Sequence, residues 1–233
     1  MLGTKALVSA SVGFVIAIVM AICIEQFGGA IGGIISSVPT TILPTTYVFF
    51  SDTTKTTEEQ SNSLFAGPIG IFATNLFFLP VWKILPGKLE KRMKNVPLTI
   101  FTLLISLITW FVSAIFMTWL ETVVSTLGVP IWLFSLIVMF ICVIVGVFLC
   151  WSLPPTPKGK NHVKWYIHII RGLAAFLCIC CTSILNSSGL GLFAGALSGF
   201  PAIFSTSIVS VSLAQGASVS TGAVGPMIIG GCA

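Results

Sequence analysis

Charged side chains are scarce in this chain. Asp, Glu, Lys and Arg make up 7% of its 233 residues, whereas soluble domains contain about 25% charged residues. Hydrophobic residues account for 56%, and the mean hydropathy is +1.08. This composition excludes a water-soluble fold and predicts an integral membrane protein surrounded by the lipid bilayer. The net charge of +5 does not indicate nucleic-acid binding, because the basic residues are concentrated in two short connecting segments.

The residue patterns of enzymes and metalloproteins are missing as well. The sequence has no phosphate-binding loop between a strand and a helix and no Ser/His/Asp arrangement. Its two histidines and seven cysteines follow no zinc or haem spacing, and most of the cysteines lie in apolar runs, where buried thiols are expected. The sequence therefore predicts neither an enzyme nor a bound metal or cofactor.

Long apolar runs are abundant. A bilayer core of about 30 Å requires about 20 apolar residues per helix. The runs predict an all-α polytopic transmembrane bundle of seven spans plus a partial eighth, 221–233, which is too short for a straight crossing. The first run lacks a small-residue cleavage site, so we expect no removable signal peptide. The seven predicted spans are 7–25, 30–50, 65–85, 98–120, 130–151, 166–186 and 189–213.

Lysines and arginines predict the orientation of these spans. They are concentrated in loops 83–94 and 158–164, whereas loop 51–63 has one lysine and loop 121–129 has no basic residue. Because basic loops stay on the cytoplasmic side, both basic loops are expected there and the N-terminus outside. We expect a multi-pass protein of the plasma membrane, with an organellar membrane as the alternative.

A repeat accompanies this topology. The stretch "GGAIGGIISSVPTTILPTT" (28–46) aligns with "LGLFAGALSGFPAIFSTSI" (190–208), and a Gly-Pro pair follows each copy. Five predicted spans separate the two copies, and an odd number inverts the second relative to the first. Inverted repeats of this kind are typical of secondary transporters. We therefore predict a first repeat at 1–151, a basic loop at 152–165 and an incomplete second repeat at 166–233.

Proline and hydroxyl side chains mark the centre of both copies. Proline inside a helix frees the carbonyl four residues earlier, and lipid cannot satisfy it. Pro39 would free the carbonyl of Ile35, and Pro201 that of Leu197. Both motifs should therefore lie inside the protein, where hydroxyls repair the break or coordinate a solute. The predicted pathway residues are Ser36, Ser37, Pro39, Thr40, Thr41, Ser198, Pro201, Ser205 and Thr206, with Glu25 and Asn75 as further polar contributors.

Other ionisable residues near the predicted spans are expected to be solvated or to lie at the membrane interface. Glu121 begins an external loop and is expected to be solvated, and His168 and Arg171 are expected to anchor span six at the interface. The sequence shows no carboxylate–cation pair within the membrane, so it gives little support to proton coupling.

The block "GGIISSVPTTILPTTYVFFSDTTKTTEEQSNSLFAGPIG" (32–70) resembles the bacterial GlpM-like proteins and their longer duplicated relatives, which are small polytopic membrane proteins. In the second half the resemblance lies in "GFPAIF" (199–204), and together these segments cover about a third of the chain. The activity of this family is unsettled, so the resemblance implies no catalytic residues. The duplicated relatives look like ten-span proteins. The seven spans and partial eighth predicted here depart from that pattern.

Two functions fit these observations. The first is a transporter or channel for a small solute or ion, with its pathway between the two Pro-kinked helices. A half-helix N-terminus there would favour anions and freed carbonyls would favour cations, so the sequence leaves this choice open. The alternative is a non-transporting membrane subunit whose Gly-rich faces dock partner helices, either in a homo-oligomer or with other membrane subunits.

Overall fold

All regular structure in the described part of the chain is helical, which confirms the predicted all-α class. The computed structural model describes residues 3–27, 41–151 and 164–215, together with 220, 221, 224, 227 and 228. The elements are α1 (Thr4–Phe27), α3 (Ile42–Ser51), α4 (Thr57–Phe65), α5 (Gly67–Ala73), the π-helical turn η1 (Thr74–Phe78), α6 (Leu79–Leu89), α7 (Asn95–Thr126), α8 (Ile131–Trp151), α9 (Trp165–Ser187), α10 (Gly191–Ser198) and α11 (Ala202–Gln215).

Three helical segments among the described residues are long and apolar enough to cross a membrane. They are Thr57–Leu89, Asn95–Thr126 and Trp165–Ser187. The first is a continuous run through α4, α5, η1 and α6, and the other two are α7 and α9. These segments support the prediction of a helical membrane protein. The predicted number of seven spans stays a prediction.

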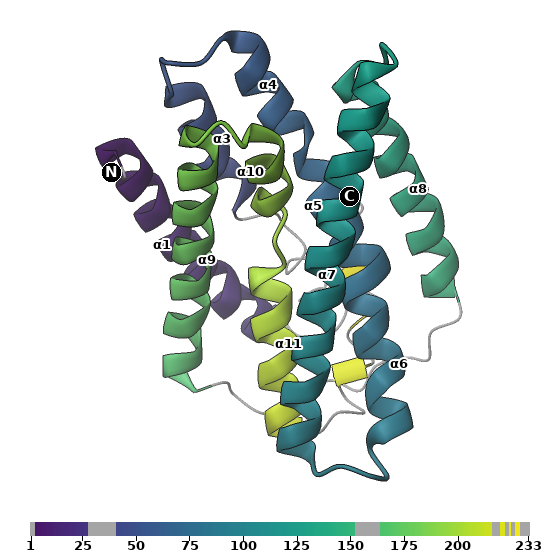
Figure 1. Ribbon diagram of the computed structural model, residues 1–233. Coiled ribbons are helices and arrows are strands. Elements are labelled where there is room, and N and C mark those ends of the chain that lie inside the picture. Colours follow the sequence, from purple (N-terminus) through teal and green to yellow (C-terminus); the bar gives the residue numbers. More distant parts are fainter. Residues whose placement is uncertain are drawn as a thin grey trace.

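The broken pair α10–α11 lies in the middle of the helical bundle. In Figure 1, α7 and α9 run along the height of the molecule, and α10 and α11 lie one above the other between them. α10 packs on α4, α5, α7 and α9, and α11 packs on α7 and α9. α1 crosses the outer side of this group and packs mainly on α9. The α10–α11 line is therefore covered by other helices on several sides.

The predicted polar loop 51–63 is wrong over its second half, because α4 begins there at Thr57. Thr56 and Glu59 form a capping box: the Thr56 hydroxyl accepts from the Glu59 amide at 3.2 Å, and the Glu59 carboxylate accepts from the Thr56 amide at 2.8 Å. These bonds satisfy amides that a helix start leaves without partners. The polar composition of this stretch thus conceals a helix start.

The predicted span 189–213 is not one helix. α10 ends at Ser198 and α11 begins at Ala202. Pro201 has no amide proton to continue the helical ladder, and Gly199 is a poor helix former. Together they turn the expected kink into a full break.

Glycines bring α10 into close contact with α4 and α5. A Cβ added to Gly195 would lie 1.9 Å from the carbonyl oxygen of Ser63, and one added to Gly70 would lie 2.1 Å from that of Ala196. Neither distance leaves room for a methyl group. Small residues allow membrane helices to approach closely in this way, so the fold depends on these positions remaining glycine.

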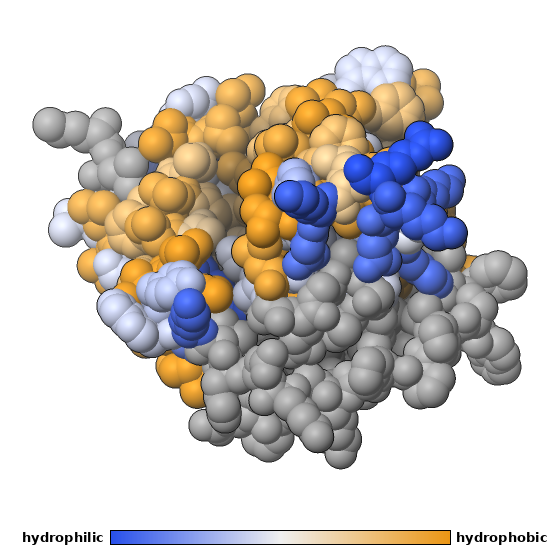
Figure 2. All heavy atoms as spheres, turned by 90° about the horizontal axis from the view of Figure 1, so that it is seen from below, coloured by the Kyte–Doolittle hydropathy of each residue, from blue (hydrophilic) through white to orange (hydrophobic). Residues whose placement is uncertain are grey.

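Basic side chains lie exposed at one end of the bundle, the lower end in Figure 1. Viewed from below in Figure 2, hydrophilic side chains gather over the connection between α6 and α7, with apolar side chains beside them. The exposed basic residues of this connection are Lys88, Lys91, Arg92 and Lys94. Lys164, before α9, is exposed at the same end. The opposite end carries the connection between α3 and α4.

Gly195→Ala should lower the thermal stability of the purified protein in detergent. The added methyl group overlaps the Ser63 carbonyl, and overpacking of this kind costs about 1–3 kcal/mol. Gly87→Ala is the matched control, because a Cβ there meets nothing within 4 Å. Differential scanning fluorimetry should show a lower melting temperature for Gly195→Ala alone. Equal melting temperatures for the two variants would contradict the tight α4–α10 contact.

Candidate functional site

The break between α10 and α11 is buried inside the bundle. Ser198 is 2% exposed and Ala202 is 1% exposed, and Pro201 between them is also buried. A helix break in such a place exposes backbone groups that neither water nor lipid can satisfy. The partners of its carbonyl groups therefore determine what the site can do.

The Leu197 carbonyl, which the sequence analysis expects Pro201 to free, has two donors. The Phe200 amide donates to it at 2.9 Å, and the Cys178 thiol of α9 donates at 3.4 Å. A tightened turn of the backbone thus replaces the bond that proline removes. The repair of this carbonyl is local, with added help from α9.

The next two carbonyls accept from hydroxyls of distant segments. The Thr41 hydroxyl, directly before α3, donates to the Ser198 carbonyl at 2.6 Å. The Thr74 hydroxyl of η1 donates to the Gly70 carbonyl at 2.9 Å and shares the same proton with the Gly199 carbonyl at 3.4 Å, a longer contact. Hydrogen bonds between membrane helices contribute about 0.6 kcal/mol on average. Here these hydrogen bonds also satisfy the carbonyl groups that the helix break leaves without helical partners.

Trp110 of α7 completes this junction. Its indole nitrogen donates to the Thr74 hydroxyl at 2.9 Å and to the Gly70 carbonyl at 3.2 Å. Its ring meets Phe200 edge-on, with centroids 5.0 Å apart and an interplanar angle of 89°. Edge-to-face packing is a favoured aromatic geometry. We call Thr41, Thr74, Trp110, Cys178 and 197–201 the broken-helix junction.

The structure brings two of the predicted pathway residues, Thr41 and Ser198, into direct contact. The Ser205 and Thr206 hydroxyls donate to the Ala202 carbonyl within α11, at 3.0 and 2.8 Å. Asn75 is fully buried in η1. Glu25 belongs to α1, but its side chain lies outside the described residues. Also outside them lie Ser36, Ser37, Pro39 and Thr40.

Below the junction, a row of hydroxyls follows the contact between α7 and α11. The Trp110–Phe200 contact and a 2.7 Å hydrogen bond between Thr99 and Ser212 show that these helices run antiparallel. Thr102 and Ser106 lie between these two contacts and are fully buried. Within the described part of the chain, their hydroxyl oxygens have no hydrogen-bond partner. We call Thr99, Thr102, Ser106, Ser205 and Ser212 the hydroxyl seam.

Arg171 is not the interfacial anchor that its position in the sequence suggests. It is 2% exposed, and its guanidinium donates to the Ser210 hydroxyl of α11 at 2.9 Å. Ser210 in turn donates to the Ser207 carbonyl at 2.9 Å. The prediction is wrong because distance from a span end does not tell which face of the helix a residue occupies. A charge thus lies inside the bundle, beside α11.

Glu121 is the second ionisable residue whose predicted position is wrong. It was expected in an external loop, but α7 continues to Thr126 and buries Glu121 to 1% exposure. The hydrophobic run ends at 120, whereas hydrogen bonding and packing carry the helix further. No pattern in the sequence marks this carboxyl as buried.

A pocket of about 370 Å³ lies at the other end of the α10–α11 line, where α10 begins. On its wall, the Lys55 ammonium donates at 2.9 Å to the side-chain oxygen of Asn186, which is 2% exposed. Lys55 is the lone lysine of its loop, and the sequence gives no other sign of a pocket. We call this the outer pocket; its lining residues are Lys55, Glu59, Asn62, Ser63, Ile131, Gly189, Leu190, Gly191, Leu192 and Phe193.

In the described residues, these features define an all-helical protein with three helical segments long and apolar enough to cross a membrane and a broken helix closed by hydrogen bonds. The chain matches no protein-family model, no curated protein and no solved structure. The resemblance to the GlpM-like proteins stays a prediction.

Thr41→Val should destabilise the protein, because it leaves the buried Ser198 carbonyl without its donor. The expected loss is about 1–2 kcal/mol. Thr126→Val is the control, since that exposed hydroxyl donates only to a carbonyl of its own helix, that of Val123. Denaturation in mixed micelles measures both variants. Equal stability of the two would show that the Thr41–Ser198 bond does not hold the break.

Proposed function

We propose that the protein is a multi-pass integral membrane transporter for a small solute or ion, and that its pathway follows the α10–α11 line. The observation that carries this proposal is the buried helix break. Its Ser198 and Gly199 carbonyls accept hydrogen bonds from the hydroxyls of Thr41 and Thr74. Secondary transporters characteristically place their substrate and ion sites at discontinuous helices inside the membrane.

We propose further crossings beside the three long apolar helices. α1 and α8 contain 24 and 21 residues, and at about 1.5 Å per residue either can span a core of about 30 Å. The exposed basic residues at the lower end favour a cytoplasmic position for that end. The outer pocket would then face outward. We propose the plasma membrane as the protein's location.

Transport by alternating access fits the junction better than passive flow through an open channel. The outer pocket lies at the start of α10, and the hydroxyl seam lies beside α11. Between them, Gly195 and Gly70 hold α10 so close to α4 and α5 that no additional methyl group fits. A closed middle between two polar regions requires movement before a solute can pass. Alternating access supplies this movement.

The hydroxyls around the break favour a cation or a solute that donates hydrogen bonds. The Ser198 hydroxyl donates to the Gly195 carbonyl at 2.6 Å, and the Ser205 hydroxyl donates to the Ala202 carbonyl at 3.0 Å. A hydroxyl that gives its proton to the backbone offers only its oxygen lone pairs to a ligand. This arrangement supports the cation side of the choice that the sequence leaves open.

The packing of the glycines favours transport over the alternative, a docking subunit. Gly13 and Gly172 form close contacts between α1 and α9, with Ile179 and Phe14 as the respective neighbours. Other segments of the chain also contact Gly70 of α5 and the α10 glycines Gly191 and Gly195. Among the described residues, these small-residue faces are therefore occupied by contacts within the chain.

Purified protein in liposomes should conduct at least one member of a panel of radiolabelled cations and small hydrogen-bonding solutes. Thr102→Val should reduce that flux about tenfold, equivalent to roughly 1.4 kcal/mol, because it removes a buried hydroxyl of the seam. This hydroxyl has no partner among the described residues, so its loss should not lower stability. The variant thus separates the pathway from folding.

Thr122→Val on the exposed face of the same helix is the matched control and should conduct like the wild type. Flux equal to that of empty liposomes across the whole panel would overturn the transport proposal. Normal flux through Thr102→Val would remove the hydroxyl seam from the pathway.

A further inference from the structure

Glu121 is a carboxyl group enclosed by the bundle. It is the one charged residue in the sequence of α7, a helix long and apolar enough to cross a membrane. Its side chain is 1% exposed. Within the part of the chain that the structure describes, neither carboxyl oxygen has a hydrogen-bond partner. A functional role is the default interpretation of such a residue inside a membrane.

The packing around Met117 shows which region Glu121 faces. Residues four apart share a helix face, so Glu121 lies one turn beyond Met117 on the same side of α7. Met117 packs in an apolar cluster with Ala196 and Leu192 of α10. Leu192 also lines the outer pocket. Glu121 therefore lies in the same half of the bundle as the outer pocket.

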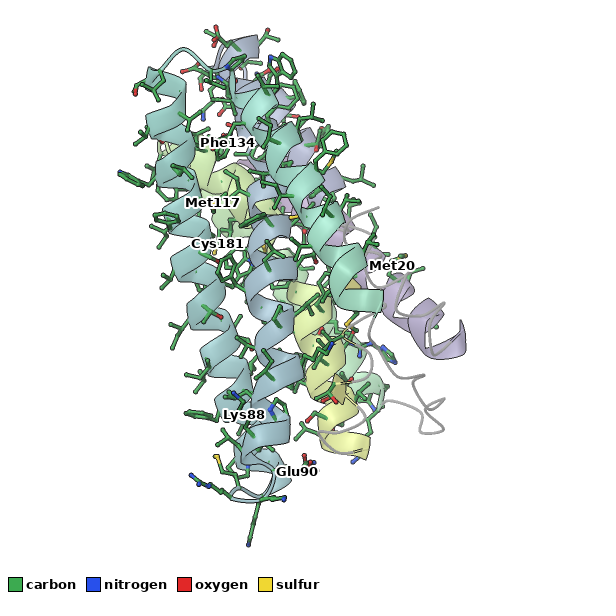
Figure 3. All side chains as sticks on the ribbon, turned by 90° about the vertical axis from the view of Figure 1, so that its right-hand side faces the viewer. Met20, Lys88, Glu90, Met117, Phe134 and Cys181 are labelled. Carbon is green, nitrogen blue, oxygen red and sulfur yellow. The ribbon has the colours of Figure 1, made fainter. Side chains whose placement is uncertain are left out.

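Figure 3 shows Met117 of α7 and Phe134 of α8 in the upper half of the bundle, away from Lys88 and Glu90 at the lower tip. Phe134 belongs to the apolar cluster around Met117. The apolar cluster one helical turn before Glu121 thus includes side chains from both α8 and α10.

The elements that pack on α7 bring little charge to this carboxyl. α5, η1, α10 and α11 contain no Asp, Glu, Lys, Arg or His, and α8 contributes only cysteines as titratable residues. α6 carries Lys83 and Lys88 toward the opposite end of α7. Lys55, just before α4, and Glu59 of α4 line the outer pocket, and Glu58 is an exposed residue of α4. None of these groups has a hydrogen bond to Glu121 in the described structure.

The charge state of an enclosed carboxyl depends on its contact with water. Burying an ionised carboxylate without a partner costs several kcal/mol or more, whereas the neutral acid is much cheaper to bury. Glu121 is thus compatible with the closed bundle when it carries a proton. It can give up that proton when water reaches the carboxyl.

We propose that Glu121 is a proton-binding site and that the protein couples solute transport to protons through it. The inference rests on the proposed transport function. The carboxylate takes one proton from water on the pocket side and becomes the neutral acid; release of the proton restores the carboxylate, and no other bond changes. The sequence gives little support to proton coupling because it shows no carboxylate–cation pair within the membrane, and it predicts Glu121 in a solvated loop; the structure buries this carboxyl in α7.

Proton binding is tested by infrared spectroscopy of the full-length protein in liposomes. The wild type should show the carbonyl stretch of a protonated carboxylic acid near neutral pH, and Glu121→Gln should lose this band. Glu58→Gln, at an exposed carboxyl, should keep it. A wild-type spectrum without the band, or a band that Glu121→Gln retains, would overturn the proposal.

Coupling is tested with liposomes that contain the pH dye pyranine. Addition of a solute from the flux panel should change the internal pH of wild-type liposomes, and Glu121→Gln should abolish the change. Glu121→Asp, which keeps a carboxyl, should restore it, a result that a merely structural role does not predict. Tracer flux without any pH change in the wild type overturns the coupling and leaves transport standing. Absence of tracer flux overturns both.

Discussion

The carbonyl groups between Leu197 and Gly199 impose the constraint on which the rest of the structure depends. Each needs a donor inside the bundle, because lipid offers none. The hydroxyls of Thr41 and Thr74 supply two of these donors. They come from segments far away in the sequence, so the break in one helix determines where the start of α3 and the turn η1 must lie.

Glycine makes these bonds geometrically possible. A Cβ on Gly199 would lie 2.9 Å from Gly70 backbone atoms, so the α5 and α10 backbones are in contact at the break. This approach brings Thr74 of η1 within reach of the Gly199 carbonyl, and Trp110 of α7 then binds Thr74. The hydrogen bonds at the break therefore depend on the close packing of α5 against α10. Any movement along α10–α11 must change the hydrogen bonds and the packing together.

The polar groups that remain lie on either side of this closed junction. The hydroxyl seam continues along α11 toward the basic end, and the outer pocket opens where α10 begins. Glu121 and Arg171 are buried beside the same line of helices, toward opposite ends. Membrane proteins keep such costly groups inside only where they serve folding or function. Their distribution along α10–α11 is the physical basis for proposing a pathway along this line.

Much of the architecture could be predicted from the sequence. The apolar runs predict helices correctly because in a membrane only helices satisfy the backbone of a single segment. Pro201 predicts a disturbed helix because it lacks an amide proton. The α4 helix was missed since its residues are polar, and the capping box at Thr56 and Glu59 decides its start. Composition misleads where a local hydrogen-bond pattern starts a helix.

The sequence by itself determined the helical class, the membrane-crossing character and the position of the break. Each of these follows from properties of neighbouring residues along one segment. Only the tertiary structure decided that Thr41 binds Ser198 and that Glu121, Arg171, Thr102 and Ser106 are buried. The physical reason is that burial and hydrogen-bond partners depend on which helices pack together. The sequence of one helix does not specify which helices pack against it.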